Sequence, residues 1–520
     1  ELNLPDHQKK YKGRVVFRGD CVKDETGGHA LFSDQGSSAS RMGGAKMIDA
    51  IARMPGMSGE NSDAVAAYTQ VPLDEAWKMM GNNPEEFPVT YISLPRNRRP
   101  RNWDQKFNDP VVVLDLNLYG HPLAGLIWEL HCEKIVKTLG FQRVPGWECI
   151  YYHVSKQLFL NIYVDDFKMA GKAENLKSMW KLIGEKIDLE PPELFHGSTY
   201  LGVIQREVEN NEEQINKKKD DMKQLLQLKT QVNQDAEHNY LNLADFKLDE
   251  SRVAGLAPRD RSSGVQSFVY DMSGHADGAV QRYLELAAPV LKDQLKALKP
   301  VATPCMDDSQ FSPEQLTKGG KLGIVAARIV LKALYLATNG RPDIYFAVNT
   351  LARKVHNWTE ADDIKLHRLI CYLQFSKEWV TTSHVGDGPE DLYLALFCDA
   401  GFAGDLLDSK STSGAFIALV GPSTFAPITW MCKKQGAVSH STTEAEIIAM
   451  DAALRMEGLA LLMLLDCIKY VFSGSVAGLA PRDPQYTGIH PLDFVPPNFT
   501  DIPHVSKLLI FEDNEAVVHQ

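Results

Sequence analysis

Residues 159–171 read FLNIYVDDFKMAG and place two adjacent acids, Asp165 and Asp166, in a stretch that is otherwise suited to burial. Apolar side chains recur at every second position before the acids, and the alternation resumes after them. A period of two is typical of a β-strand. We therefore expect two strands here, with both acids at or near the turn of a β-hairpin.

Two like charges side by side repel each other unless a cation lies between or beside them. The simplest interpretation of the pair is a solvated hairpin tip, since Asp is common in turns. The other interpretation is a two-metal phosphoryl-transfer site, in which several carboxylates converge on Mg²⁺ ions about 3.5–4 Å apart. Mg²⁺ prefers oxygen ligands, and its charge removes the repulsion between adjacent acids. The hairpin alone leaves both interpretations open.

The size and charge of the chain limit the class of protein. Its 520 residues are enough for several domains, and 44% hydrophobic with 23% charged residues is ordinary for a globular protein. A formal net charge of −12 excludes a nucleic-acid binder that is basic as a whole. Two local clusters, RNRRPR at 96–101 and KKK at 217–219, are either phosphate contacts or solvated surface.

Cysteine use and hydropathy exclude further classes. The eight cysteines include no C-x-x-C pair, which argues against a zinc ribbon or a disulfide framework and favours a reducing compartment. We find no signal peptide, and no apolar run reaches the roughly 18 residues of a membrane span. The chain begins at Glu1 and ends within the pattern FEDNEAVVHQ, so we expect it to be a fragment.

Local patterns before residue 385 predict a mixture of helices and strands. The expected elements are a β-prone stretch at 12–19, a polar turn ending at Asp63, a helix at 123–139, a charged helical segment at 205–249, a loop-rich segment at 250–320, and helices at 321–377 with breaks near Pro342 and Trp358.

After residue 385 the pattern changes to three strands and a helix, which is typical of an α/β domain. The strands are LYLALFCD, TSGAFIALV and APITWMCKK, and the helix runs from near Thr443 to near Tyr470. We therefore expect a domain boundary near 385. The octapeptide VAGLAPRD occurs at 253–260 and at 476–483, and we interpret both copies as linker material because two copies are too few for a repeat architecture.

The motif YVDD at 163–166 resembles the signature hairpin of reverse transcriptases, and the blocks around it resemble the polymerase region of copia-type LTR retrotransposons. In that family an upstream strand supplies a third aspartate in the pattern D-x-x-x-A-[FY], which DAVAAY matches here. The resemblance implies that Asp63, Asp165 and Asp166 hold the catalytic metal ions. It also implies that Tyr68 is the steric gate beneath the incoming sugar, with a core tyrosine as the structural alternative.

Three further blocks occur in the order of the family. KGRVVFRG at 12–19 resembles its fingers motif, which implies that Lys12 and Arg14 bind the triphosphate, since cationic donors neutralise charge that develops on phosphoryl oxygens. TYLGV at 199–203 resembles the primer-grip region. The segment 331–353 resembles the part that follows the polymerase, and its expected role is helix packing.

The segment after residue 385 resembles the RNase H domain of the same elements. CDAGFAGDLLDSKSTSG contains Asp399, the implied first metal ligand, and Asp405 and Asp408 are expected to shape the turn that follows. LLIFEDNEAVV contains Asp513, the implied third ligand, for which an N-cap role is the structural alternative. The fourth acid of such sites normally lies further downstream, so we expect this site to be incomplete.

Two glutamates compete for the second position of this site. Glu444 and Glu446 both satisfy the capping-box spacing, with Ser441 and Thr443 respectively, so either can have a purely structural role. One helix needs only one such cap. The family pattern E-x-x-A implies that Glu446 is the ligand.

The resemblance as a whole implies RNA-directed DNA polymerase activity with attached RNase H, from a Pol polyprotein that also carries protease and integrase. It implies a palm-and-fingers reverse transcriptase at 1–250, a loop-rich linker and helical connection at 251–384, and a C-terminally truncated RNase H-like α/β domain at 385–520. Implied cofactors are two Mg²⁺ ions in each site, with Mn²⁺ as a substitute.

The implied partners are an RNA template, a primer, an RNA/DNA hybrid and dNTPs, with no membrane and an open oligomeric state. The implied location is cytoplasmic, in virus-like particles, with nuclear entry as a further expectation. The alternative is a decayed or domesticated remnant that binds nucleic acid without turnover. It is favoured by the block NLYGHPLAGLIWE, in which Leu123 and Leu126 replace the family's polar glutamine and arginine.

Overall fold

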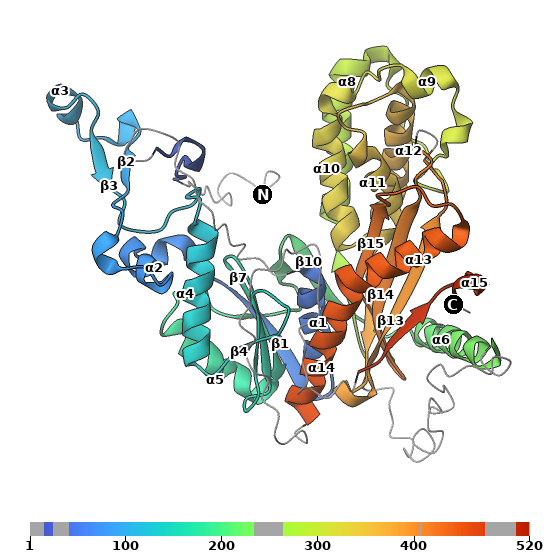
Figure 1. Ribbon diagram of the computed structural model, residues 1–520, viewed down its shortest axis with the longest axis horizontal. Helices are drawn as coiled ribbons and strands as arrows, with labels where there is room; N and C mark the ends of the chain where they lie inside the picture. Colours follow the sequence, from blue (N-terminus) through green and yellow to red (C-terminus); the bar gives the residue numbers. More distant parts are fainter. Residues whose placement is uncertain (1–14, 24–40, 233–263, 406–407, 474–505, 519–520) are drawn as a thin grey trace.

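The structure is a computed structural model, and it describes residues 15–23, 41–232, 264–405, 408–473 and 506–518. Two large β-sheets and a helical bundle make up most of these residues (Figure 1). The mixed α/β, multidomain class expected from the sequence is confirmed. In the described ranges, no helix combines the length and the apolar character that crossing a bilayer requires.

The first sheet has six strands in the order β4-β5-β6-β7-β1-β8. Its strands are β1 (Met57–Asp63), β4 (Gln142–Arg143), β5 (Ile150–His153), β6 (Leu158–Tyr163), β7 (Asp166–Lys172) and β8 (Glu193–Leu194). Helices α4 (Ala124–Thr138) and α5 (Ala173–Gly184) share one apolar cluster with these strands. The helix expected at 123–139 is therefore confirmed as α4.

The expected β-hairpin around the paired acids is confirmed. Strands β6 and β7 are antiparallel, with Tyr163 opposite Asp166, so that Val164 and Asp165 form the turn.

The expectation of a polar turn before Asp63 is wrong, because these residues form β1, which lies between β7 and β8 in the sheet. Asn61 and Ser62 are polar yet buried in this strand. Asn61 Nδ2 donates to Ser198 Oγ at 2.7 Å, and Ser62 Oγ donates to the Glu190 carbonyl at 2.6 Å. Partners more than a hundred residues away thus bind the amide nitrogen of Asn61 and the hydroxyl of Ser62, the polar side chains that made this segment read as a turn.

The second sheet has eight strands in the order β16-β13-β14-β15-β12-β11-β10-β9. Its strands are β9 (Thr199–Tyr200), β10 (Val203–Val208), β11 (Gln266–Asp271), β12 (Thr381–Val385), β13 (Tyr393–Gly401), β14 (Thr412–Gly421), β15 (Thr424–Lys434) and β16 (Leu508–Phe511). The three strands expected after residue 385 are confirmed as β13, β14 and β15. The long helix is also confirmed, as α13 (Thr442–Ala453) and α14 (Leu459–Ser473), joined by a π-helical turn at Leu454–Gly458.

The helical bundle rises from one end of the second sheet (Figure 1). Its helices are α8 (Ser273–Leu291), α9 (Pro313–Thr317), α10 (Gly323–Asn339), α11 (Tyr345–Arg353) and α12 (Glu360–Ser376). The helices expected at 321–377, and their breaks near Pro342 and Trp358, are confirmed. The loop-rich segment expected at 250–320 is wrong over β11 and α8, which lie in the sheet and the bundle.

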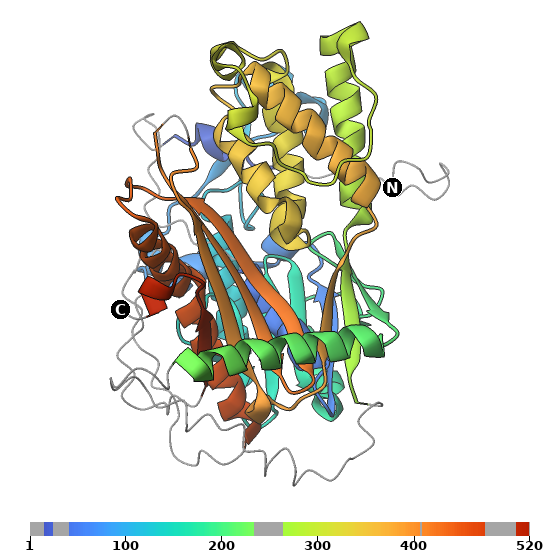
Figure 2. The ribbon, with the colours of Figure 1, turned by 90° about the vertical axis from the view of Figure 1, so that its right-hand side faces the viewer.

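Two other expectations need correction. The helical segment at 205–249 begins as strand β10, and only then continues as α6 (Glu212–Val232), which lies across the strands of the second sheet (Figure 2). In the β-prone stretch 12–19, residues 15–18 form no strand, and a 3₁₀ turn begins at Gly19. Residues 233–249 and both copies of the octapeptide lie outside the described residues.

Helix α1 (Met42–Ala52) lies between the two sheets (Figure 1). It contacts β1, β6 and β7 of the first sheet, β15 of the second sheet, and α14. Every residue from Gly43 to Ala52 is buried. One apolar core therefore includes side chains of both sheets and of the bundle. The eight-stranded sheet draws strands from all three predicted domain segments, and the domain division itself stays a prediction.

Helix α1 also carries buried charge. Asp49 accepts hydrogen bonds from Lys168 on β7, from Gln205 on β10 at 2.9 Å, and from Tyr270 on β11 at 2.9 Å. Lys46 lies 3.8 Å from the centroid of the Trp430 ring. Burial lowers the pKa of Lys46 to about 7, although Asp49 opposes the shift. Asp49 is therefore the counter-charge of a polar cluster that joins both sheets.

We expect Lys46→Met to raise the free energy of unfolding at pH 7 by about 1–4 kcal/mol, because it removes a desolvated ammonium group from the core. Between pH 7 and 10.5 the unfolded chain holds a proton on Lys46 that the folded chain lacks, so this residue makes stability rise with pH there. Urea denaturation at pH 7 and pH 9 measures both effects. A variant with unchanged stability and an unchanged pH slope would show that Lys46 is not desolvated.

Candidate active sites

The first group of predicted acids lies where β1 ends beside the β6–β7 turn. Asp63, the last residue of β1, is paired directly with Asp166, the first residue of β7. The backbone N–H of Ala64 donates to the Asp165 carbonyl at 2.7 Å and fixes the end of β1 to the turn. Asp63 is exposed, whereas Asp165 and Asp166 are half-buried. The structure thus brings all three acids to one end of the first sheet.

Burial and mutual repulsion disfavour the charged form of Asp166 in this group. Burial raises the pKa of Asp166 to about 7, and the charges of Asp63 and Asp165 and a side-chain hydrogen bond with Asp63 add to the rise. The positive charge of Lys168 opposes it. A divalent cation between the carboxylates would remove this repulsion. The three carboxylates are spaced more widely than those of the second site, since in the described part of the chain only the second site has three ligand atoms within 4.8 Å of one another.

The turn is held by a contact that the sequence did not reveal. Val164 has a φ of 56°, which is strained for a β-branched residue. The buried side chain of Trp128, on α4, donates from Nε1 to the Val164 carbonyl at 2.5 Å. Trp128 belongs to the block NLYGHPLAGLIWE, but only the fold brings it to the acids. The turn is therefore positioned from α4 as well as from β1.

Tyr68 and the altered block lie on the same side of this sheet. The ring centroids of Tyr68 and Tyr119 are 4.6 Å apart, and both Tyr68 and Leu123 pack against the apolar cluster of the first sheet. This packing is compatible with the core alternative, and the gate role of Tyr68 stays a prediction. Leu126 is half-buried on α4. Lys12 and Arg14 lie outside the described residues.

The turn between β9 and β10 and helix α10 also approach the first site. Tyr335, on α10, donates its hydroxyl to the Leu201 carbonyl, and His275 lies 2.8 Å from the Gly202 carbonyl. Burial raises the pKa of Tyr335, and the neighbouring Tyr163 and Asp166 add to the rise. The TYLGV segment, α10 and the acids are therefore neighbours. Sequence analysis missed Tyr335, because its helix follows the hairpin by more than 150 residues.

The second group of predicted acids is compact. One ligand oxygen from each of Asp399, Glu446 and Asp513 can be chosen so that all three lie within 4.8 Å of one another. Asp399 comes from β13, Glu446 from α13, and Asp513 follows β16, which is parallel to β13. Burial raises the pKa of Glu446 to about 7, and Glu512, Asp399 and Asp513 add to the rise. The buried Oε2 of Glu446 has no hydrogen-bond partner among the described residues, so the cluster offers a cation a free oxygen.

The competition between the two glutamates has a structural answer. Ser441 is the N-cap of α13, and its Oγ accepts from the backbone N–H of Glu444 at 3.1 Å. The Glu444 carboxylate accepts from the backbone N–H of His440 at 2.6 Å. Glu444 therefore caps the helix, whereas Glu446, two residues further on, is buried beside Asp399.

Three other acids near the second site are not members of its compact cluster, namely Asp405, Asp408 and Glu512. Asp405 and Asp408 form ion pairs with Lys434 at 2.5 and 2.7 Å, which fits their expected role in shaping the turn. Glu512 lies beside Glu446 and accepts from Cys398 Sγ at 3.3 Å. Sequence analysis did not propose Glu512, although it directly precedes Asp513.

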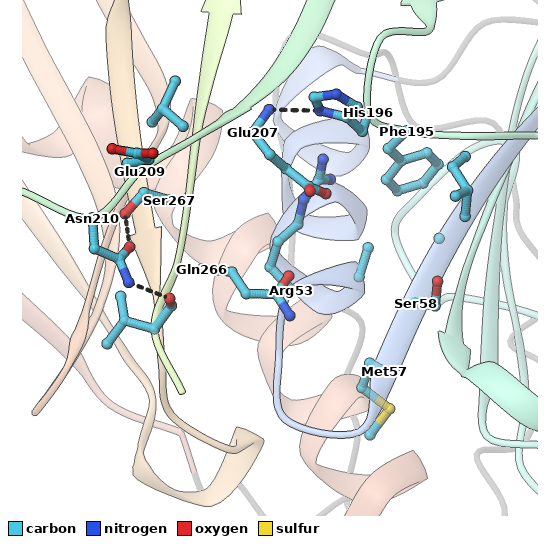
Figure 3. Close-up of a pocket in the computed structure, with 15 residues that line it drawn as sticks. Arg53, Met57, Ser58, Phe195, His196, Glu207, Glu209, Asn210, Gln266 and Ser267 are labelled. Carbon is cyan, nitrogen blue, oxygen red and sulfur yellow. Dashed lines mark hydrogen bonds between the residues drawn. The ribbon is translucent and has the colours of Figure 1, made fainter. Parts of the chain in front are cut away.

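A pocket of about 550 Å³ lies beside the C-terminal end of α1 (Figure 3). Side chains from the end of α1, from β1, and from β10 and β11 line it, among them Arg53, Ser58, Glu207 and Gln266. None of the predicted site residues that the structure describes lines this pocket.

Comparisons with known proteins agree with the resemblance found in the sequence. No family model matches the chain. The putative transposon Ty5-1 protein of Saccharomyces cerevisiae is 23% identical over 334 residues, which cover 64% of this chain and 84% of that protein. The Pol polyprotein from transposon RE1 of Arabidopsis thaliana is 36% identical over 149 residues, or 28% of this chain. That of transposon TNT 1-94 of Nicotiana tabacum is 22% identical over 448 residues, or 85% of this chain.

The chain spans only 10% of the RE1 polyprotein and 27% of the TNT 1-94 polyprotein. A foamy viral protease-reverse transcriptase, solved in complex with double-stranded DNA, aligns with 87% of this chain and 54% of that one at 10% identity and a TM-score of 0.38. A TM-score this low supports no conclusion about function. The sequence relatives to which the chain is similar are Ty/copia-type retrotransposon Pol polyproteins.

Proposed function

We propose that the chain is an RNA-directed DNA polymerase with an attached RNase H, and that each activity uses two-metal phosphoryl transfer. The observation that carries the proposal is the gathering of acids from distant parts of the sequence into two groups, one at the β6–β7 turn and one at β13, α13 and β16. The arrangement proposed for the first sheet and its helices is that of palm and fingers. The similarity to these relatives supports the same function.

Both groups fit Mg²⁺, because their donors are carboxylate oxygens and each group contains a carboxyl whose pKa is raised to about 7. Asp63, Asp165 and Asp166 would hold the ions of the first site, and Asp399, Glu446 and Asp513 those of the second. Bound Mg²⁺, or Mn²⁺ in its place, activates the attacking oxygen and stabilises the leaving oxygen in such sites.

In the proposed polymerase reaction, the primer 3′-hydroxyl attacks the α-phosphate of a dNTP and pyrophosphate leaves. The contribution of this chain is preorganisation. The pairing of β1 with β7 sets the separation of Asp63 and Asp166, and Trp128 holds the turn that carries Asp165. The backbone therefore holds the three acids at one end of the sheet before substrate binds. Lys12 and Arg14 are the proposed contacts of the triphosphate, and Tyr68 is the proposed gate.

The proposed partners are an RNA template, a primer and their hybrid with DNA. The basic cluster at 96–101 supports a nucleic-acid contact, because Arg96, Arg98 and Arg101 are exposed near the two-stranded ribbon of β2 (Tyr91–Ser93) and β3 (Val111–Val113). This ribbon projects at one end of the molecule (Figure 1). Exposed aromatic side chains, Tyr91 and Phe107, accompany the arginines, as in surfaces that bind single strands. The proposed location is the virus-like particle in the cytoplasm, with later entry into the nucleus.

Primer extension on an RNA template in Mg²⁺ tests the polymerase assignment. The proposal expects template-dependent incorporation of dNTPs by the wild-type chain. If the chain binds the primed template but incorporates nothing, the alternative of a remnant without turnover is correct.

Cleavage of the RNA strand of a hybrid tests the second site. We expect Glu446→Gln to reduce cleavage by about 10²–10³-fold, because it removes a charged oxygen from the cluster. Glu444→Gln is the matched control and keeps cleavage within a few-fold of wild type, since that side chain caps α13. Equal loss in both variants would contradict the assignment of Glu446.

Below about pH 7 a proton competes with Mg²⁺ for Glu446, so the wild type is expected to need a higher Mg²⁺ concentration for hybrid cleavage at pH 6 than at pH 8.

A further inference from the structure

Gln435 directly follows β15 and connects the elements that carry two of the acids of the second site. Its side chain is 5% exposed. Its Nε2 donates to the Ala445 carbonyl at 2.8 Å and to Ser413 Oγ at 3.1 Å. Its Oε1 accepts from Ser439 Oγ at 2.9 Å. One buried amide therefore joins α13, β14 and the segment between β15 and α13.

The partners of Gln435 are direct neighbours of the acids. Ala445 precedes Glu446 on α13, and Ser413 is paired across the sheet with Ala400, which follows Asp399 on β13. The backbone of Ala400 also lies beside the Glu446 carboxylate. The buried alanines Ala400, Ala445 and Ala449 form a small cluster, so α13 packs closely against β13 here. The two hydrogen bonds of Nε2 thus fix the distance between the backbones that carry Asp399 and Glu446.

We propose that Gln435 is a positioning residue for the acid cluster Asp399, Glu446 and Asp513, a role that rests on the RNase H function proposed above. In this proposed role Gln435 itself binds neither substrate nor cation. It acts by holding the first turns of α13 against β14, so that the free Oε2 of Glu446 stays beside the Asp399 carboxylate. Groups that orient metal ligands in this way typically change metal affinity by about 10–100-fold when they are removed.

The test compares Gln435→Met with Ser439→Ala in the full chain. Methionine keeps the approximate shape of glutamine but makes none of the three hydrogen bonds. Ser439→Ala removes only the hydrogen bond from Ser439 to Oε1 of Gln435, and it leaves the bonds to α13 and β14 in place. Mn²⁺ affinity, measured by electron paramagnetic resonance, is expected to fall by at least about tenfold in Gln435→Met and by less than about twofold in Ser439→Ala. Hydrogen exchange over residues 442–450 is expected to accelerate only in Gln435→Met.

Ser413→Ala provides a second test if Gln435→Met does not fold. It removes a single bond of Nε2, and a loss of about fivefold in Mn²⁺ affinity is expected, as for one hydrogen bond. Wild-type affinity and wild-type exchange in these variants would overturn the role of Gln435. If the wild type binds no Mn²⁺ at the cluster, the RNase H proposal falls, while the exchange comparison still decides whether Gln435 holds α13.

Discussion

Asp165→Asn is expected to reduce primer extension on an RNA template by about 10²–10³-fold, because it removes one of the charges that would hold Mg²⁺ at the β6–β7 turn. The side chains have nearly the same shape, so the strand pairing of β6 and β7 should survive. Steady-state incorporation of a labelled dNTP, with wild type and variant at equal concentration, measures the effect. Equal incorporation by both proteins would eliminate the polymerase assignment.

Two controls separate loss of chemistry from loss of structure. Asp188→Asn changes an exposed aspartate of the same part of the chain, which lies outside the acid group, and it should keep wild-type incorporation. The Asp165→Asn protein itself should still cleave the RNA strand of a hybrid at the wild-type rate, because its second acid cluster lies on a different sheet. Loss of both activities in Asp165→Asn would indicate misfolding instead.

Asp49→Ala is expected to lower the free energy of unfolding by about 3–5 kcal/mol, the usual cost of removing one partner from a buried ionic cluster. Asp49 is 2% exposed, and the substitution leaves the ammonium group of Lys168 buried without its counter-charge. It also removes the acceptor of the Gln205 and Tyr270 hydrogen bonds. Urea denaturation monitored by tryptophan fluorescence measures the change.

The matched control is Asp74→Ala on the surface helix α2 (Leu73–Met79). Asp74 and Lys78 form an exposed ion pair at 3.6 Å, so its loss should change stability by less than about 1 kcal/mol. An effect of Asp49→Ala as small as that of the control would show that the cluster between the sheets is solvated.

The parts of the fold that sequence analysis predicted correctly depend on local patterns. The period-two alternation around Asp165 and the long apolar runs after residue 385 report strands without reference to the rest of the chain. Strand β11 and helix α8 were missed for the opposite reason. The partners of β11, namely β10 and β12, lie far away in sequence, and α8 contains Gly274, Gly278 and Pro289, which weaken a helical pattern.

The candidate sites show the same division. The motifs predicted which acids belong together, and the fold brings each group together. Sequence spacing could not decide between Glu444 and Glu446, because both satisfy the capping pattern and only the helix start at Ser441 separates them. The roles of Trp128 and Gln435 were not predicted either, since each acts through a hydrogen bond to a backbone carbonyl of another part of the fold, which sequence patterns do not report.

Anomalous diffraction from crystals of the full chain with a primed RNA template and Mn²⁺ tests the central claim most directly. The account predicts Mn²⁺ peaks within coordination distance of Asp63, Asp165 and Asp166, and a separate peak among the carboxylates of Asp399, Glu446 and Asp513. Crystals in which nucleic acid is bound and neither group of acids has a Mn²⁺ peak would contradict it.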